Sequence, residues 1–274
     1  MLWSKLPLEQ QNEYVHFLKI FGALSGLFKD HSAGDNARKP FLHYRNHEQL
    51  YARTFDVIDL TRKDSAFDVV FEDETQRVGI GLKTWIHTND FTYQKVAEFN
   101  KDAPELIHPL IAQGDAEEVV KKVAELRNER ISLDKRLYKT DQEIYHYVTR
   151  DDDYMYINET TYDYIDIENI EVTKETKTTY HFTDQQNNYR YYNSKSVLLE
   201  EFDASENKRL ASIPIQQYDD PFLLLESLGN VEGSQKKTGN PYIYLPIYAD
   251  RSMKVNEKSA FNAWNAAPKN KNSK

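Results

Sequence analysis

The chain has no cysteine, which excludes disulfide bonds and thiolate metal sites. Any metal must therefore be held by oxygen or imidazole ligands, which favours Mg²⁺, Ca²⁺ or Mn²⁺ over structural zinc. The sequence also has no apolar run near the roughly 20 residues that span a bilayer. Its first residues, MLWSKLPLEQQ, lack the basic and apolar regions of a signal peptide. We therefore expect a cytoplasmic protein with no membrane partner.

Positive charge is in deficit, because 35 Lys and Arg residues face 44 Asp and Glu residues, for a net charge of −9. This balance argues against a general polyanion binder, but it allows a locally basic cleft that grips DNA. The 274 residues, 39% of them hydrophobic, suffice for one large domain or for one domain with a smaller appendage.

The first half of the chain has mostly helical spacing of its apolar residues. This spacing predicts helices over residues 9–29, 45–55, 92–101 and 103–138. The last of these is interrupted at Gly114 and Asp115, and Asp115 is placed to cap its second part.

After Thr140 the sequence changes to β-branched and aromatic runs with period-two alternation, separated by Asp and Asn turns. We expect antiparallel strands here, followed by a helix over residues 194–202. The predicted fold is α+β, with N-terminal helices around a hairpin core and then an antiparallel β-rich half. The expected regions are a core over 1–140, a β-rich half with DNA contacts over 141–250, and a basic, flexible tail over 251–274.

The most informative stretch is AFDVVFEDETQRVGIGLKTW, which predicts a hairpin with Asp68 on one strand and Lys83 on the other. A carboxylate in an apolar strand is tolerated only when it is paired or bound to a cation. Gly81 and Lys83 share one face of the second strand, and the glycine leaves room for a ligand to approach. A lysine there would offset charge on a phosphate or orient a water. The competing interpretation is an exposed hairpin with ordinary surface charges.

Two glutamates are candidates for a further carboxylate. Glu98 lies in the predicted helix 92–101, which would pack across the hairpin and project this side chain at the metal. Glu48 lies in the predicted helix 45–55, as a ligand of a second metal or as a partner that orients Lys83. Either glutamate is equally compatible with a solvated helix surface.

No nucleophile elbow, phosphate-binding glycine loop, dinucleotide fingerprint or HExxH zinc motif is present. Three residues of the second half are candidates for DNA contacts. His146 and Arg150 share one strand face, from which they would reach phosphates or base edges. Lys195 lies at the start of the helix predicted over 194–202, where it would position a phosphate. The alternatives are structural. A lone histidine in a strand, such as His146, can serve packing alone, and capping of the helix by Ser194 would explain the residues around Lys195.

The segments IGLKTW, YQKVAEFNKD, LRNERI, YHYVTR, YDYIDIENI and YNSKSVLLEEF together resemble type II restriction endonucleases and similar nuclease domains. The order of GIGLKT followed by QKVAEFNK is the more specific part. The resemblance implies a PD-(D/E)xK-like core whose second-strand acid is displaced from position 81. The segment VNEKSAFNAWNA is similar to one that precedes the DNA-reading domain of phospholipase-D-type restriction enzymes, but the chain has no HxK pair.

The resulting hypothesis is a Mg²⁺-dependent endonuclease that cuts double-stranded DNA at a defined sequence. Asp68 and Glu98 would bind the metal, Lys83 would position the water, and Glu48 would support them. A palindromic target would require a homodimer. The alternatives are a non-catalytic DNA-recognition module, in which Gly81 marks lost catalysis, and a structural scaffold that binds protein partners. Asp68, Lys83 and Glu98 must come together for the nuclease hypothesis to hold.

Overall fold

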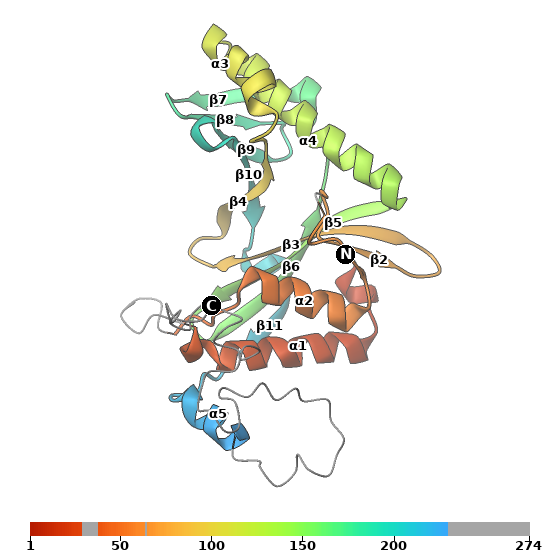
Figure 1. The fold of residues 1–274 in the computed structure, drawn as a ribbon, viewed down its shortest axis with the longest axis vertical. Coiled ribbons are helices and arrows are strands. Elements are labelled where there is room, and N and C mark those ends of the chain that lie inside the picture. The colour runs from red at the N-terminus through yellow and green to blue at the C-terminus, as the bar shows by residue number, and fades with distance from the viewer. Residues whose placement is uncertain (29–37, 64, 230–274) are drawn as a thin grey trace, which may run out of the picture. The chain divides into compact units, whose positions relative to one another are not determined.

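The computed structural model describes residues 1–28, 38–63 and 65–229, and its helices and sheets form the expected α+β fold (Figure 1). Residues Met1–Pro221 form one compact unit, and Phe222–Lys274 form a second. The described part of the second unit belongs to helix α5 (Pro221–Gly229). The tail predicted over 251–274 lies outside the described residues. Within these residues, no helix has the length and apolar character needed to cross a membrane.

The first sheet has six strands and contains the predicted hairpin. In spatial order, its strands are β1 (Ile58–Asp59), β2 (Val69–Glu72), β3 (Arg77–Ile86), β5 (Gln142–Asp151), β6 (Tyr154–Thr161) and β11 (Arg209–Pro214). Strand β3 pairs antiparallel with β2 and parallel with β5, and the other neighbours are antiparallel. The hairpin is therefore confirmed, and its second strand lies inside the sheet.

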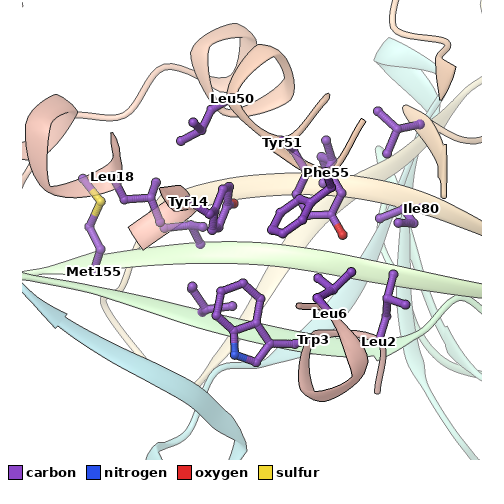
Figure 2. Close-up of a cluster of buried hydrophobic side chains, with 14 of the residues drawn as sticks. Leu2, Trp3, Leu6, Tyr14, Leu18, Leu50, Tyr51, Phe55, Ile80 and Met155 are labelled. Carbon is purple, nitrogen blue, oxygen red and sulfur yellow. The ribbon is translucent and has the colours of Figure 1, made fainter. Parts of the chain in front are cut away.

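Helices α1 (Leu8–Ala23) and α2 (Tyr44–Phe55) cover one face of this sheet (Figure 1). In Figure 2, Tyr14 of α1, Tyr51 and Phe55 of α2, and Ile80 of β3 belong to one cluster of buried side chains. Both helices were predicted, although α1 ends at Ala23 and a 3-10 turn, η2 (Ser25–Leu27), follows it. The opposite face of β3 carries Gly79, which packs against Phe67, and Gly81 and Lys83, which line a cavity.

The second sheet has five strands, all antiparallel to their neighbours. In spatial order they are β4 (Phe91–Glu98), β10 (Val197–Asp203), β9 (Asn188–Tyr192), β8 (Thr179–Thr183) and β7 (Glu171–Glu175). Four further 3-10 turns lie elsewhere in the described part of Met1–Pro221: η1 (Trp3–Lys5), η5 (Ile167–Asn169), η6 (Asn193–Lys195) and η7 (Glu206–Lys208). Residues on both sides of position 140 contribute strands to each sheet.

The connection from β3 to the parallel strand β5 runs through the second sheet and a helical segment. This segment comprises η4 (Ala103–Ile107), α3 (His108–Gln113) and α4 (Ala116–Tyr138). The break before α4 was predicted, and the Asp115 side chain accepts a hydrogen bond from the amide of Glu118, as expected for a cap. The first half of α4 packs on the second sheet through Val120 and Val123, whereas Ile131 joins a cluster on the first sheet.

Two predicted helices are wrong. Residues 92–101 form mainly strand β4, because Phe91, Thr92, Tyr93 and Val96 favour extended structure and β10 supplies the pairing partner. Residues 194–202 form a 3-10 turn and strand β10, along which buried and partly exposed side chains alternate. The glutamates in VLLEEF favour a helix locally, but pairing with strands on both sides decides the conformation.

Candidate functional site

A cavity of about 670 Å³ lies on the face of the first sheet opposite α1 and α2. It is lined by residues of both sheets and of α4. Asp68, Lys83 and Glu98 all line it, so the three side chains that the nuclease hypothesis requires do share one cavity. Glu48 is not part of this lining.

Asp68 is held in place by backbone hydrogen bonds immediately before β2. Its amide donates to the carbonyl of Ile80 at 2.9 Å, and its Oδ2 accepts from the amide of Leu82 at 2.6 Å. The preceding loop is anchored to α4, because the buried carboxylate of Asp134 accepts hydrogen bonds from Ser65 Oγ and the Ala66 amide. Desolvation raises the pKa of Asp68, and Lys83 and the Leu82 amide oppose this shift.

Lys83 projects from β3 into the same cavity as Asp68. Desolvation lowers the pKa of its ammonium, and the negative charge of Asp68 opposes the shift. Lys95, on β4 of the second sheet, lowers the pKa of Lys83 further, which shows that the two cations are within electrostatic reach. An anion placed between them would relieve this repulsion.

Gly81 lies between two close neighbours and has no room for a carboxylate. In the register of β3 with β5, Gly81 is directly opposite Tyr145. A Cβ atom added at Gly81 would lie 2.7 Å from Cδ1 and Cε1 of Tyr145, and 3.3 Å from Cε1 of Tyr162. The aromatic rings of Tyr145 and Tyr162 therefore occupy the space that a second-strand acid would need.

Glu48, on α2, has a raised pKa although it does not line the cavity. Desolvation raises its pKa to about 7, and the carboxylates of Asp68 and Asp59 add to the shift. Lys83 lowers the pKa of Glu48, so the glutamate interacts with both residues of the predicted pair. Burial is the main cause of the raised pKa of both Glu48 and Asp68, and a bound cation would lower both values.

Glu98 reaches the cavity from a strand, so the prediction that a helix carries it is wrong. Its carboxylate is largely exposed and interacts with Lys95 Nζ at 2.9 Å and with the Asn100 side-chain amide. These hydrogen bonds lower its pKa, and neither Asp68 nor Lys83 contributes to the shift. Glu98 thus lies on the cavity wall with partners of its own.

The cavity is basic although the chain is acidic. Its lining contains the cations Lys83, Lys95, Lys101, Arg127 and Arg130, and the acids Asp68, Glu98 and Asp102. Over the whole chain, the ratio of cations to acids is reversed. Arg127 pairs with Glu200 and Lys95 with Glu98, so only part of this positive charge is available to an anionic ligand.

Three predicted DNA contacts have different outcomes. His146 has no exposed surface: it contacts Tyr14 Oη at 3.1 Å and Glu159 at 3.3 Å in a buried network with His47, so the prediction of a DNA contact is wrong. Arg150 is half-buried and donates to the carbonyl of Pro40, so its contact with DNA stays a prediction. Lys195 is exposed, but it ends a 3-10 turn before a strand, so the helix N-terminus that motivated its assignment is absent.

Sequence reasoning missed Arg127, Tyr145 and Tyr162, which form the back of the cavity. Arg127 is 2% exposed and donates to Glu200 Oε2 at 3.0 Å and to the carbonyl of Asp163 at 2.7 Å. A signal was present, because Arg127 follows Val120, Val123 and Ala124 along the apolar face of α4. A charged residue on such a face requires a buried partner.

Within residues 1–28, 38–63 and 65–229, no group of three or more His, Asp or Glu side chains is arranged to hold a metal ion. Comparison with known proteins adds no family assignment, since no family model, curated protein or solved structure matches the chain.

Proposed function

We propose that the chain is a Mg²⁺-dependent endonuclease that hydrolyses phosphodiester bonds of double-stranded DNA at a defined sequence. One observation carries this proposal: Asp68, immediately before β2, and Lys83, on the adjacent strand β3, line a cavity whose lining has more cations than acids. A phosphate would enter between Lys83 and Lys95, where its negative charge offsets the repulsion between the two ammonium groups. Lys83 would stabilise the charge that develops on the phosphate and orient the attacking water.

The small number of carboxylates near Lys83 suits Mg²⁺ better than a cation whose ligands all come from the protein. Mg²⁺ usually binds one or two carboxylates and completes its coordination with waters and substrate phosphate. Asp68 and Glu48 would supply these two carboxylates: burial raises the pKa of both, and a bound cation would offset the cost of desolvating their charges. The ion would supply Lewis acidity and lower the pKa of a bound water. Glu98 lines the cavity and pairs with Lys95, and in this proposal it is not one of the two carboxylates that bind the ion.

The deciding experiment is cleavage of plasmid DNA with Mg²⁺ by the wild type and by Lys83→Ala. We expect cleavage by the wild type and a loss of about 100-fold to 1000-fold in the variant, the range for removal of one preorganised charge-stabilising group. Lys174→Ala is the matched control, because Lys174 is exposed on β7 and does not line the cavity. Equal cleavage by the wild type and Lys83→Ala, or no cleavage of any DNA, would refute the proposal.

We further propose that the enzyme acts as a homodimer on a palindromic site, because two strand cuts require two active sites. Light scattering of the protein on its target duplex checks this assembly. A single copy bound to the duplex during cleavage of both strands would contradict it.

A second candidate function is a DNA-recognition module that binds without cutting. The observation that favours it is the filling of the acid position by Tyr145 and Tyr162, which leaves the hairpin without its second carboxylate. Gel-shift assays separate the two functions. Binding of duplex DNA without cleavage in Mg²⁺, Mn²⁺ or Ca²⁺ would support the module, and cleavage would exclude it.

A further inference from the structure

Of the described side chains, that of Tyr145 comes nearest to a Cβ atom added at position 81, where a second-strand acid would sit. Gly81 and Tyr145 are register partners on the parallel strands β3 and β5, so their side-chain positions lie next to each other on the same face of the sheet. The 2.7 Å distances from an added Cβ to two ring carbons mean that the ring lies against the α-carbon of Gly81. Only glycine at position 81 allows the ring to be there.

The ring of Tyr145 is fixed by aromatic and charged neighbours. It stacks on Tyr162 with centroids 3.9 Å apart and an interplanar angle of 17°, and it meets Phe202 edge-on at 5.0 Å. Tyr162 is held in turn, because its hydroxyl donates to the carbonyl of Ala66 at 3.1 Å and the guanidinium of Arg127 lies 5.2 Å from its ring centroid. The Tyr145 ring therefore provides a rigid surface in the cavity.

Lys83 is placed on this surface. Its Nζ lies 5.8 Å from the centroid of the Tyr145 ring, within the range of a cation–π interaction. A carboxylate at position 81 would pair with the ammonium and neutralise it. The uncharged ring directs the ammonium without cancelling its charge, so the charge remains available to an anionic ligand.

We propose that Tyr145 is a positioning residue for Lys83, and that its ring takes the place of the second-strand carboxylate beside the lysine. The kinetic part of this inference rests on the proposed nuclease function. The structural part, that the ring sets the place of the lysine, does not.

The kinetic test compares Tyr145→Phe, which keeps the ring, with Tyr145→Leu, which removes it, in steady-state cleavage of plasmid DNA with Mg²⁺. We expect the Phe variant to cleave like the wild type. The Leu variant should have kcat lowered about 100-fold, the order of effect of a misplaced catalytic group, with KM unchanged. A Phe variant as slow as the Leu variant, or a Leu variant as fast as the wild type, would overturn the proposal.

A second substitution reaches the ring from the other side. Gly81→Ala adds the Cβ that collides with Tyr145, so it should displace the ring and lower kcat in the same way. Because both changes act on one contact, the double variant Gly81→Ala/Tyr145→Leu should be no slower than Tyr145→Leu alone. If the fold-reductions in kcat of the two single variants multiply in the double variant, Tyr145 does not act through this contact.

A third measurement does not depend on cleavage. In NMR spectra of the wild type, the side-chain protons of Lys83 and the α-protons of Gly81 should carry ring-current shifts. We expect these shifts to persist in Tyr145→Phe and to disappear in Tyr145→Leu, with thermal melts showing that both variants fold. If wild-type protein fails to cut DNA while the shifts behave as expected, the nuclease proposal fails and the positioning of Lys83 stands. If the Lys83 shifts are the same in Tyr145→Leu as in the wild type, the positioning proposal fails, whatever the cleavage result.

Discussion

Replacement of Glu48 by glutamine should stabilise the protein at alkaline pH. The carboxyl of Glu48 has a pKa of about 7 in the folded protein against its usual 4.5, because desolvation and the carboxylates of Asp68 and Asp59 disfavour its charge. The folded state thus binds more protons than the unfolded state between these two values, and stability falls as the pH rises through this window. Glutamine has no charge to desolvate, so the variant avoids this loss.

The size of the effect follows from the two pKa values. Their difference corresponds to at most about 3 kcal/mol at pH 8. The Glu48 side chain is only half-buried, and solvent screening reduces such an energy strongly, so we expect a gain of about 1 kcal/mol. At pH 5 both the folded carboxyl and the glutamine are neutral, and most of the gain should vanish.

Urea unfolding of the wild type and Glu48→Gln at pH 5 and pH 8 measures this difference. Glu98→Gln is the matched control, because hydrogen bonds lower the pKa of Glu98 and its substitution should not stabilise at either pH. A Glu48→Gln variant that is less stable than the wild type at pH 8, or a gain that is equal at both pH values, would refute the reasoning. Added Mg²⁺ should reverse the order at pH 8, since it would stabilise only the protein that retains the carboxylate.

Three further predictions concern buried polar groups. Arg127→Met should lower the free energy of unfolding by about 3–5 kcal/mol, because Glu200 is left buried without its cation. In urea unfolding, the double variant Arg127→Met/Glu200→Met should regain most of this stability. A double variant as unstable as Arg127→Met would contradict the ion-pair explanation. Desolvation lowers the pKa of His47 well below 6.5, so stability should fall as the pH drops below about 6.5, where only the unfolded state takes up the proton. Between pH 5 and pH 7, the free energy of unfolding of His47→Gln should depend less steeply on pH than that of the wild type. An unchanged slope would count against this assignment. Asp134→Ala removes the acceptor for the Ser65 hydroxyl and the Ala66 amide, and should cost about 1–3 kcal/mol in thermal unfolding, whereas no loss would mean that the loop before Asp68 is held by other contacts.

The sequence predicted the hairpin and its surroundings because local signals agreed there. Alternation along β3 correctly assigned Ile80 and Leu82 to the core, and Gly81 and Lys83 to the opposite face. The cap at Asp115 was equally local, since it depends on a hydrogen bond to a residue three positions away.

The errors arose where partners distant in the sequence decide the structure. Residues 92–101 and 194–202 each contain helix-favouring glutamate and alanine or leucine, but they pair with each other as β4 and β10. A single sequence gives no sign of this pairing, which joins segments about a hundred positions apart. The burial of His146 likewise depends on Tyr14 and Glu159, from α1 and β6, which no local pattern connects.

The candidate site was predicted in part. Asp68, Lys83 and Glu98 line one cavity, but Glu98 pairs with Lys95, and the predicted metal site that joins these residues stays a prediction. The aromatic filling of the acid position was not foreseen, because it depends on the parallel pairing of Gly81 with Tyr145 across a long connection.

That parallel pairing also has a consequence for how the chain folds. Ile80 and Ile144 are register partners 64 positions apart (144 minus 80), with β4 and the helices up to α4 between them. Closing so long a connection costs chain entropy before any contact compensates for it, and parallel pairs of this kind form slowly. Because α4 packs on both sheets, its docking shortens the search for the β3–β5 pair. We therefore expect the cavity, whose walls come from both strands and from α4, to be among the last parts of the molecule to form.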